Sequence, residues 1–364
     1  MITVTKPYLP NRERLNKYID EIYASSQLTN HGRLLSELER RLEELFGVDN
    51  VICVANGTLA LQVAYKSLGL KGEVITTPFS YAATTTSLKW EGLTPRFSDI
   101  DSKTLNVDPC QIERKINSRT SAIVGVHVYG NPCDHPQIQS LARGNGLKLI
   151  YDAAHCFGVH ETAGYGKESK SVFMLGDIST VSFHATKLFH TVEGGALIVN
   201  DAALARKIRR MINFGLPLGE DENQIQGTNA KLSEFHAAMG LAVLDDLELI
   251  NECRRSIWDI YFTQLRDSVE FQLWNPRYAN NFAYAPIIFR CEDSLLRVKA
   301  KLENVNIMSR RYFFPSLPKI FCQDRDACPI SEDISHRILC LPIYPDLSEN
   351  DATRIAEYVK SEVK

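Results

Sequence analysis

The sequence lacks the features that would associate it with a membrane or with nucleic acid. It contains no uninterrupted apolar run of membrane-spanning length, and residues 1–6 show no basic region followed by an apolar segment. The formal net charge of −3 gives no reason to expect attraction to nucleic acid or to an anionic bilayer. We therefore expect a cytoplasmic protein whose partners are small molecules, with neither nucleic acid nor membrane among them.

Paired cysteines are also missing. The nine cysteines are odd in number and scattered, and none belongs to a Cys-x-x-Cys pair. Disulfide frameworks and zinc sites are recognised by such spacings. The sequence therefore predicts reduced, mostly structural thiols and no metal centre.

Internal repeats and low-complexity tracts are absent, so the organisation has to be inferred from the alternation of elements. At 364 residues the chain is long enough for about two domains. Short apolar runs alternate with segments of helical periodicity, which is typical of an α/β protein with a mostly parallel sheet. Strands are expected at 51–54, 73–77, 122–128, 147–151, 178–183 and 196–200, and helices at 12–25, 34–46, 59–68, 81–91, 109–116 and 202–212.

The pattern changes after residue 200. We expect one long helix at 233–261 that bridges two domains, and then a smaller α+β unit. Its expected elements are a strand at 282–289 and helices at 294–303 and 349–363, the last with a capping box at Ser348 and Asp351. The predicted division is a large domain at 1–245 and a small C-terminal domain at 246–364.

Lys187 lies in the connection between the expected strands 178–183 and 196–200. A lysine in a tight turn between buried strands can form a Schiff base with an aldehyde when its surroundings favour the neutral amine. That is the chemistry of a pyridoxal phosphate enzyme. Most lysines near strand ends are solvated surface charges, however, so the motif alone leaves both interpretations open.

Asp152 and His155 follow another expected strand end, where ligands gather in such sheets. A carboxylate there can pair with a protonated pyridine nitrogen, and it can equally be a helix cap or an ion-pair partner. His155 is a candidate hydrogen-bond partner for a cofactor hydroxyl or a satisfied, half-buried histidine.

Two further turns are candidate cofactor contacts. Asn56-Gly57-Thr58 precedes a helix whose first N–H groups suit a phosphate, although Asn-Gly is also a common tight turn and Thr58 a possible cap. Tyr81 follows a strand and a Pro turn, where its ring either stacks on a flat heterocycle or packs at the rim of the core.

Taken together and in this order, these motifs resemble the DegT/StrS family of pyridoxal phosphate-dependent sugar-nucleotide aminotransferases. The resemblance covers nearly the whole chain and rests on Asp152-Ala-Ala-His155, Ser182-Phe-x-x-x-Lys187 and Glu193-Gly-Gly. Further shared segments are Lys6-Pro7, 28–32, 97–101, 213–215, 227–238 and 311–317. It implies the fold type I of pyridoxal phosphate-dependent transferases, which is that of aspartate aminotransferase.

The resemblance also implies roles for individual residues. Lys187 carries the Schiff base and moves the proton, Asp152 pairs with the pyridine nitrogen, and His155 contacts the cofactor hydroxyl. The remaining cofactor contacts that it implies are stacking by Tyr81 and phosphate binding by Gly57, Thr58, Ser182 and, from the neighbouring subunit, Asn229. A homodimer with active sites shared across the interface follows from that last contact.

For the substrates, the resemblance implies L-glutamate as amino donor and a nucleotide-linked keto-6-deoxy sugar as acceptor. The expected acceptor is dTDP-4-dehydro-6-deoxy-D-glucose, which becomes dTDP-4-amino-4,6-dideoxy-D-glucose. A dTDP-3-keto-6-deoxyhexose and a UDP- or GDP-linked 4-keto sugar are the alternatives, and O-antigen or other surface-polysaccharide synthesis is the expected pathway. Candidate contacts to the diphosphate or sugar are His184, Arg310, Arg311 and Tyr312.

Two positions depart from the usual family pattern. Asn56 stands where the family more often has serine, and Val192 where it more often has glycine.

Two other functions are considered beside the aminotransferase. A dehydratase branch of the family replaces the lysine with histidine, and Lys187 argues against this branch. A non-catalytic regulator that binds pyridoxal phosphate or a sugar nucleotide has no chemical need for the Lys187, Asp152 and His155 trio, which favours an enzyme.

Overall fold

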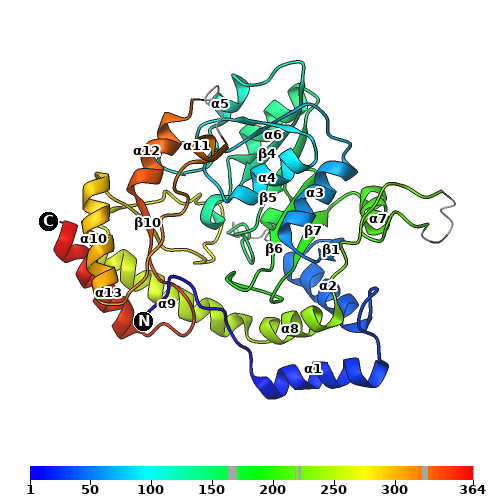
Figure 1. Cartoon of the computed structure of the whole chain (residues 1–364), viewed down its shortest axis with the longest axis horizontal. Coiled ribbons are helices and arrows are strands. Elements are labelled where there is room, and N and C mark those ends of the chain that lie inside the picture. The colour runs from blue at the N-terminus through cyan, green and yellow to red at the C-terminus, as the bar shows by residue number, and fades with distance from the viewer. Residues whose placement is uncertain (163–169, 218, 220–222, 322–326, 364) are drawn as a thin grey trace.

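A seven-stranded sheet forms the centre of the larger part of the molecule (Figure 1). The computed structural model describes residues 1–364 except 163–169, 218, 220–222, 322–326 and 364. The strand order is β1-β7-β6-β5-β4-β2-β3, with β7 antiparallel to both neighbours and the other pairs parallel. The strands are β1 (Val51–Val54), β2 (Glu73–Thr76), β3 (Thr94–Phe97), β4 (Thr120–Val126), β5 (Lys148–Asp152), β6 (Ile178–Ser182) and β7 (Gly195–Val199). The predicted α/β class with a mixed, mostly parallel sheet is confirmed.

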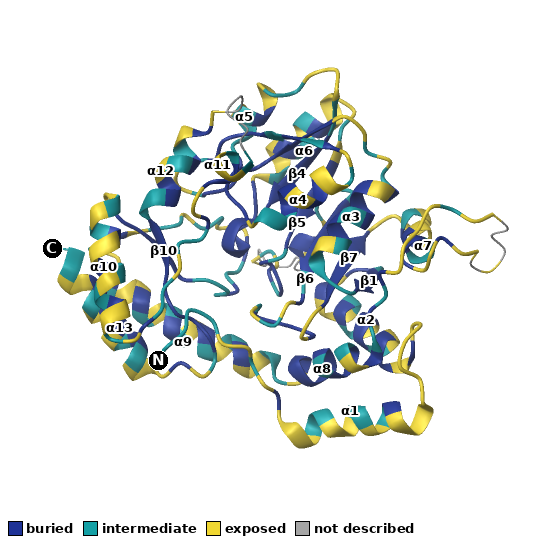
Figure 2. Cartoon of the chain, viewed as in Figure 1, coloured by how far each residue is buried: buried dark blue, intermediate teal, exposed yellow. Residues whose placement is uncertain are grey.

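Helices cover both faces of this sheet because its strands are apolar on both sides. In β1, Val51 and Cys53 pack with one core cluster, while Ile52 and Val54 pack with another on the opposite face. Figure 2 shows the buried strands between helices whose outer surfaces are exposed. The covering helices are α2 (Arg33–Phe46), α3 (Gly57–Ser67), α4 (Ala82–Trp90), α5 (Pro109–Glu113), α6 (His135–Gly144), α7 (Ala202–Met211) and α8 (Glu234–Leu244), with α1 (Arg12–Ser25) packed outside α8.

A second, antiparallel sheet of three strands, β10-β9-β8, lies in the C-terminal part of the chain. The first residues belong to the same region, because Ile2 forms a bridge with Ile307. The elements here are α9 (Leu247–Leu265), β8 (Glu270–Phe271), β9 (Pro286–Ile288), α10 (Glu292–Asn304), α11 (Leu317–Phe321), α12 (Pro329–Arg337), β10 (Ile338–Cys340) and α13 (Glu349–Val363). The predicted domain boundary at 245 stays a prediction. No helix in the described ranges is long and apolar enough to cross a membrane.

Most of the predicted elements are confirmed within a few residues, including the last helix. At its start the Ser348 hydroxyl accepts the Asp351 N–H at 3.0 Å. The predicted long helix at 233–261 is wrong, because α8 ends at Leu244 and α9 begins at Leu247. The predicted strand at 282–289 is also too long, since only Pro286–Ile288 is a strand.

Residues from two other helices bind the chain at the break between α8 and α9. The Arg41 guanidinium on α2 donates to Asp245 at 2.8 Å, and the Tyr18 hydroxyl on α1 donates to the same carboxylate at 3.0 Å. Arg14, also on α1, pairs with Asp246. Both aspartates are therefore bound by other helices at the point where the chain changes direction.

Two carboxylates from the shared family segments cap distant helices. Asp99, just after β3, accepts the N–H groups of Ile330 and Ser331 at 2.9 Å and so caps α12. Glu234 accepts the N–H groups of Leu34 at 2.8 Å and Leu35 at 3.2 Å at the start of α2. Each cap joins parts of the chain that are far apart in sequence.

We predict that Asp99→Ala lowers the free energy of unfolding by about 2 kcal/mol, because it removes the cap and leaves the N–H groups of half-buried Ile330 and buried Ser331 without an acceptor. Urea unfolding measures the change. The control is Asp333→Ala, which removes only an exposed carboxylate paired with Arg337 and should cost less than about 1 kcal/mol. Equal effects from the two substitutions would contradict the structural role of Asp99.

Candidate active site

A cavity of about 770 Å³ lies at the carboxyl ends of β5 and β6 and is closed on its other side by residues from the C-terminal part of the chain. Every sequence-predicted site residue lines it except Asn229 and Arg311. Those that line it are Gly57, Thr58, Tyr81, Asp152, His155, Ser182, His184, Lys187, Arg310 and Tyr312. Motifs spread over the chain thus meet in one place.

Lys187 projects into this cavity from the turn between β6 and β7. Its backbone N–H is held by the His184 carbonyl at 2.9 Å, and its Nζ lies 3.2 Å from the Tyr284 hydroxyl. Burial lowers the pKa of Lys187, and the nearby Asp152 carboxylate partly opposes this effect. The site therefore favours the neutral, nucleophilic amine more than an exposed site does.

Asp152 is the last residue of β5 and is buried. One carboxylate oxygen accepts the Thr84 hydroxyl at 2.7 Å, and the other accepts the Ala154 N–H at 3.1 Å. Burial raises the pKa of Asp152, while these two hydrogen bonds and Lys187 favour its ionised form. The result is a fixed, buried carboxyl group in the wall of the cavity.

His155 is buried among aromatic rings. Its Nδ1 accepts the backbone N–H of Tyr129 at 3.2 Å, which leaves the proton of the neutral ring on Nε2. Burial lowers the pKa of His155 well below its usual value, so the imidazole stays neutral. The ring of Tyr284 lies 4.6 Å away between centroids. His155 is thus a neutral hydrogen-bond donor.

The start of α3 forms a cradle for an anion. The Asn56 side chain, at the position where the family more often has serine, caps the helix by accepting the Leu59 N–H at 2.9 Å. A Cβ on Gly57 would lie 2.9 Å from that of Ser182, and one on Gly195 would lie 2.7 Å from the Gly57 nitrogen. Only glycine permits this close packing, which brings the Thr58 and Ser182 hydroxyls to one end of the cavity.

These groups fit pyridoxal phosphate. The cavity combines a lysine with a depressed pKa, a fixed carboxylate, a neutral histidine donor and a helix N-terminus suited to phosphate. Among the residues with described positions, no group of His, Cys, Asp and Glu is arranged to hold a metal ion.

Two predicted site residues lie elsewhere. Arg311 donates to Glu292 at 2.6 Å and to the His336 carbonyl at 3.2 Å, and its guanidinium lies over the Phe314 ring. Arg311 is thus bound to groups outside the cavity lining, and its predicted substrate contact stays a prediction. Asn229 is exposed and outside the cavity of its own chain.

Sequence reasoning missed several residues of the site. Tyr284 and Phe313 line the cavity, and Thr84 binds Asp152 from α4. Tyr284 falls inside the segment predicted as a regular strand, where nothing marks it as different from a packing residue. Thr84 stands in a run of threonines, and only the fold distinguishes it from its neighbours.

Val192 has a φ of 70°, in the left-handed region that β-branched residues disfavour. This is the position where the family more often has glycine. The His190 Nδ1 accepts the Val192 N–H at 3.2 Å, and the Thr191 hydroxyl donates to the Glu193 carbonyl at 2.8 Å. These bonds hold the loop in its conformation despite the valine.

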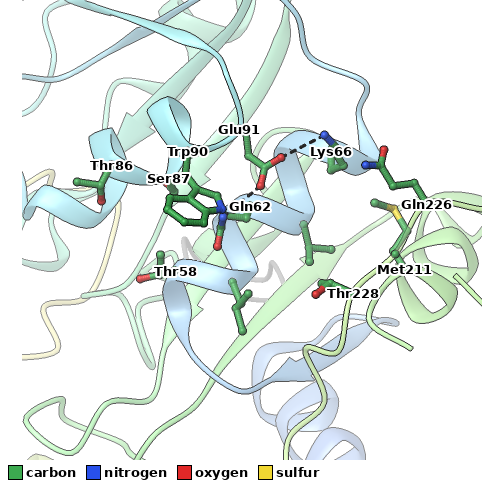
Figure 3. A pocket seen from close by; sticks show the side chains of 13 residues that line it. Thr58, Gln62, Lys66, Thr86, Ser87, Trp90, Glu91, Met211, Gln226 and Thr228 are labelled. Carbon is green, nitrogen blue, oxygen red and sulfur yellow. Dashed lines mark hydrogen bonds and ion pairs between the residues drawn. The ribbon is translucent and has the colours of Figure 1, made fainter. Parts of the chain in front are cut away.

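A second hollow, of about 560 Å³, lies along α3 next to the cavity (Figure 3). It shares Thr58, Leu59 and Gln62 with the cavity and is lined on another side by residues 226–228, immediately before Asn229. Trp90 stands at its edge with 82% of its surface exposed. An ion pair between Lys66 and Glu91 crosses this hollow at 3.3 Å.

Comparison with known proteins decides the family. Residues 10–360 match the DegT/DnrJ/EryC1/StrS aminotransferase family. The chain belongs to this family. It is therefore an enzyme of the sugar aminotransferase family, which is a family of pyridoxal phosphate-dependent aminotransferases.

Individual relatives of this aminotransferase match it over nearly their full length. It is 41% identical to the dTDP-4-amino-4,6-dideoxy-D-glucose transaminase of Shigella dysenteriae, with 100% of this chain and 98% of the relative covered. The enzyme of the same name from Escherichia coli is 36% identical, with coverage of 98% and 97%. The crystal structure of DesI, solved in the presence of its TDP-sugar product, superposes with a TM-score of 0.91 at 34% identity and covers 100% and 93% of the two chains.

For this aminotransferase we predict that Asp152→Asn lowers the pKa of Lys187 further. The Asp152 charge raises the pKa of Lys187, so removing the charge leaves the effect of burial less opposed. Reaction of cofactor-free protein with a trace amine reagent over a pH series, read by mass spectrometry, should show the midpoint for Lys187 moving to lower pH. The control is the exposed Lys148, which lies on β5, the strand that ends at Asp152, and it should be labelled equally in both proteins. An unchanged or higher midpoint for Lys187 would exclude this coupling.

Proposed function

We propose that the protein transfers the amino group of L-glutamate to dTDP-4-dehydro-6-deoxy-D-glucose, forming dTDP-4-amino-4,6-dideoxy-D-glucose. The observation that carries this proposal is the meeting of Lys187, Asp152 and His155 with the α3 N-terminus in one cavity. The choice of acceptor is supported by the 41% and 36% identity, over nearly full length, to two transaminases that bear the name of this product.

Each residue of the cavity has its own role toward the cofactor. When bound, pyridoxal phosphate supplies an electron-accepting ring that stabilises negative charge at the substrate carbon. Asp152 is suited to hold the proton on the ring nitrogen, and His155 Nε2–H to donate to the ring hydroxyl oxygen. Gly57, Thr58 and Ser182 surround the end of the cavity that suits the phosphate.

Lys187 has two tasks in this proposal. Its Nζ would hold the cofactor through the aldehyde carbon, and as a neutral amine it would accept a proton from the substrate carbon. A lowered pKa serves both tasks, because each requires the unprotonated amine. Tyr284 covers Lys187 from the C-terminal part of the chain and limits the access of water. Tyr81, 62% exposed, stands at the rim in a position to stack on a bound ring.

We further propose a homodimer in which the partner completes the phosphate site through its own Asn229. Two features of the single chain support this arrangement. Asn229 is exposed and does not reach its own cavity, and the second hollow beside Thr58 presents a large exposed tryptophan, Trp90 (Figure 3). Exposed aromatic residues of this kind are characteristic of protein interfaces.

The first test of the function is spectroscopic. The lysine-bound cofactor absorbs in the visible, and adding L-glutamate without sugar should bleach this band and raise the near-ultraviolet band of the aminated cofactor. The dTDP-linked 4-keto sugar should then restore the visible band, whereas 3-keto, UDP- or GDP-linked sugars should do so poorly. A band that glutamate leaves unmoved would favour a non-catalytic binding protein.

The substitution Lys187→Ala tests the catalytic role of Lys187. Because the general base is lost, turnover should fall by at least ~100-fold, while the protein remains folded and retains weak, non-covalent cofactor binding. Steady-state amino transfer and circular dichroism provide the two measurements. Near-normal turnover by this variant would exclude Lys187 from catalysis.

The proposed dimer is tested by Trp90→Glu, which places a charge at the second hollow. Sedimentation velocity should show a dimer for the unaltered protein and a shift toward monomer for the variant, because burying an unpaired carboxylate is costly. Leu296→Glu is the matched control on α10, where the leucine is 45% exposed, and it should leave the dimer intact. Dissociation by both variants or by neither would argue against an interface at Trp90.

A further inference from the structure

The charged side chains of the active-site cavity differ in whether they have hydrogen-bond or ion-pair partners. Asp152 accepts two hydrogen bonds, and Glu193 lies 3.6 Å from the His184 Nε2. Arg310 also lines the cavity, but within the described ranges no carboxylate pairs with it. Its guanidinium instead lies 4.8 Å from the centre of the Tyr312 ring. The cavity therefore presents one permanent cation whose hydrogen-bond donors are available to a ligand.

Backbone hydrogen bonds fix the main chain at Arg310. The Arg310 N–H donates to the Cys340 carbonyl at 3.1 Å, and the Cys340 N–H donates to the Arg310 carbonyl at 2.8 Å. Tyr312, under the guanidinium, receives the Tyr129 hydroxyl on its carbonyl oxygen. By contrast, the next residue, Arg311, forms an ion pair with Glu292. The two adjacent arginines thus have different roles, and only Arg310 faces the cavity.

Two tyrosines connect Arg310 with the reacting amine. Moving outward from Lys187 Nζ, the first contact is the Tyr284 hydroxyl at 3.2 Å, and the Tyr284 and Tyr312 ring centres are 6.0 Å apart. The Arg310 guanidinium lies 4.8 Å from the centre of the Tyr312 ring and acts electrostatically on Tyr284. Arg310 is thus connected to the amine through two tyrosines, a placement suited to an anionic group that is separated from the reacting carbon.

Both substrates of the proposed function carry such a remote anion, and this inference rests on that function. In glutamate, methylene carbons separate the side-chain carboxylate from the reacting carbon. In the 4-keto sugar nucleotide, the pyranose ring separates the reacting carbon from the diphosphate. The substrates occupy the cavity in turn, so one cation can serve both.

We propose that Arg310 is a shared anion receptor, which binds the side-chain carboxylate of the amino donor in one half-reaction and the diphosphate of the acceptor in the other. It therefore determines the preference for a dicarboxylic donor over a monocarboxylic one such as L-alanine. A guanidinium suits this dual role, since its planar fork matches both carboxylate and phosphate oxygens.

The first experiment measures binding without chemistry. Titration calorimetry of cofactor-free protein with dTDP should give an affinity that falls roughly 10-fold to 100-fold in Arg310→Met. Glutarate, which has the remote carboxylate but no amine, should compete with dTDP in the unaltered protein. Absence of competition together with unchanged dTDP affinity in the variant would overturn the proposal.

The second experiment reads donor selectivity. The ratio of kcat/KM for L-glutamate to that for L-alanine should fall roughly 10-fold to 100-fold in Arg310→Met, because only glutamate loses a contact. Arg310→Lys retains the charge without the fork and should recover part of the ratio. Arg297→Met, which removes a charge from the surface of α10, is the control and should keep both the ratio and the dTDP affinity.

The outcomes separate this inference from the proposed function. If glutamate bleaches the visible band of the unaltered enzyme but Arg310→Met and Arg310→Lys keep its donor ratio, the shared receptor is wrong and the aminotransferase stands. If glutamate fails with the unaltered enzyme while glutarate still competes with dTDP, the donor assignment fails and the anion site at Arg310 stands.

Discussion

The burial of Lys187 beside Asp152 is the constraint on which the active site depends. An amine with a depressed pKa requires removal from water, yet a carboxylate close enough to pair with a cofactor ring raises that pKa again. The structure balances the two effects by binding Asp152 to Thr84 and Ala154 and by covering Lys187 with Tyr284. The large sheet supplies the charged pair, and the C-terminal part of the chain supplies the cover.

The alternation of helices and strands could be predicted because the buried strands of this sheet are continuous apolar runs in the sequence. Val51, Ile52, Cys53 and Val54 are all apolar since both faces of β1 are covered, and such runs are visible without a structure. The break between α8 and α9 could not be predicted in this way. Helices α1 and α2 bind Asp245 and Asp246 at this break, and these contacts exist only in the folded protein.

The same distinction applies to the candidate site. Lys187, Asp152 and His155 follow strand ends, where chemistry is expected, and the cavity unites them. Arg310 and Arg311 are indistinguishable in sequence, because what separates them is the position of Glu292 and the direction of a short segment beside β10. Family segments around Asp99 and Glu234, with no catalytic role assigned, prove to be helix caps between distant parts of the chain.

The cover over Lys187 also has a consequence for the order in which the protein is made. Tyr284 lies 97 residues after Lys187 in the chain, and Tyr312 and Phe313 follow later still. A ribosome therefore completes all strands of the large sheet, with the lysine among them, well before it makes the residues that close the cavity. The nascent chain carries an open lysine, and the reactive, desolvated amine arises only when the last third of the polypeptide has been synthesised and has packed against the first two.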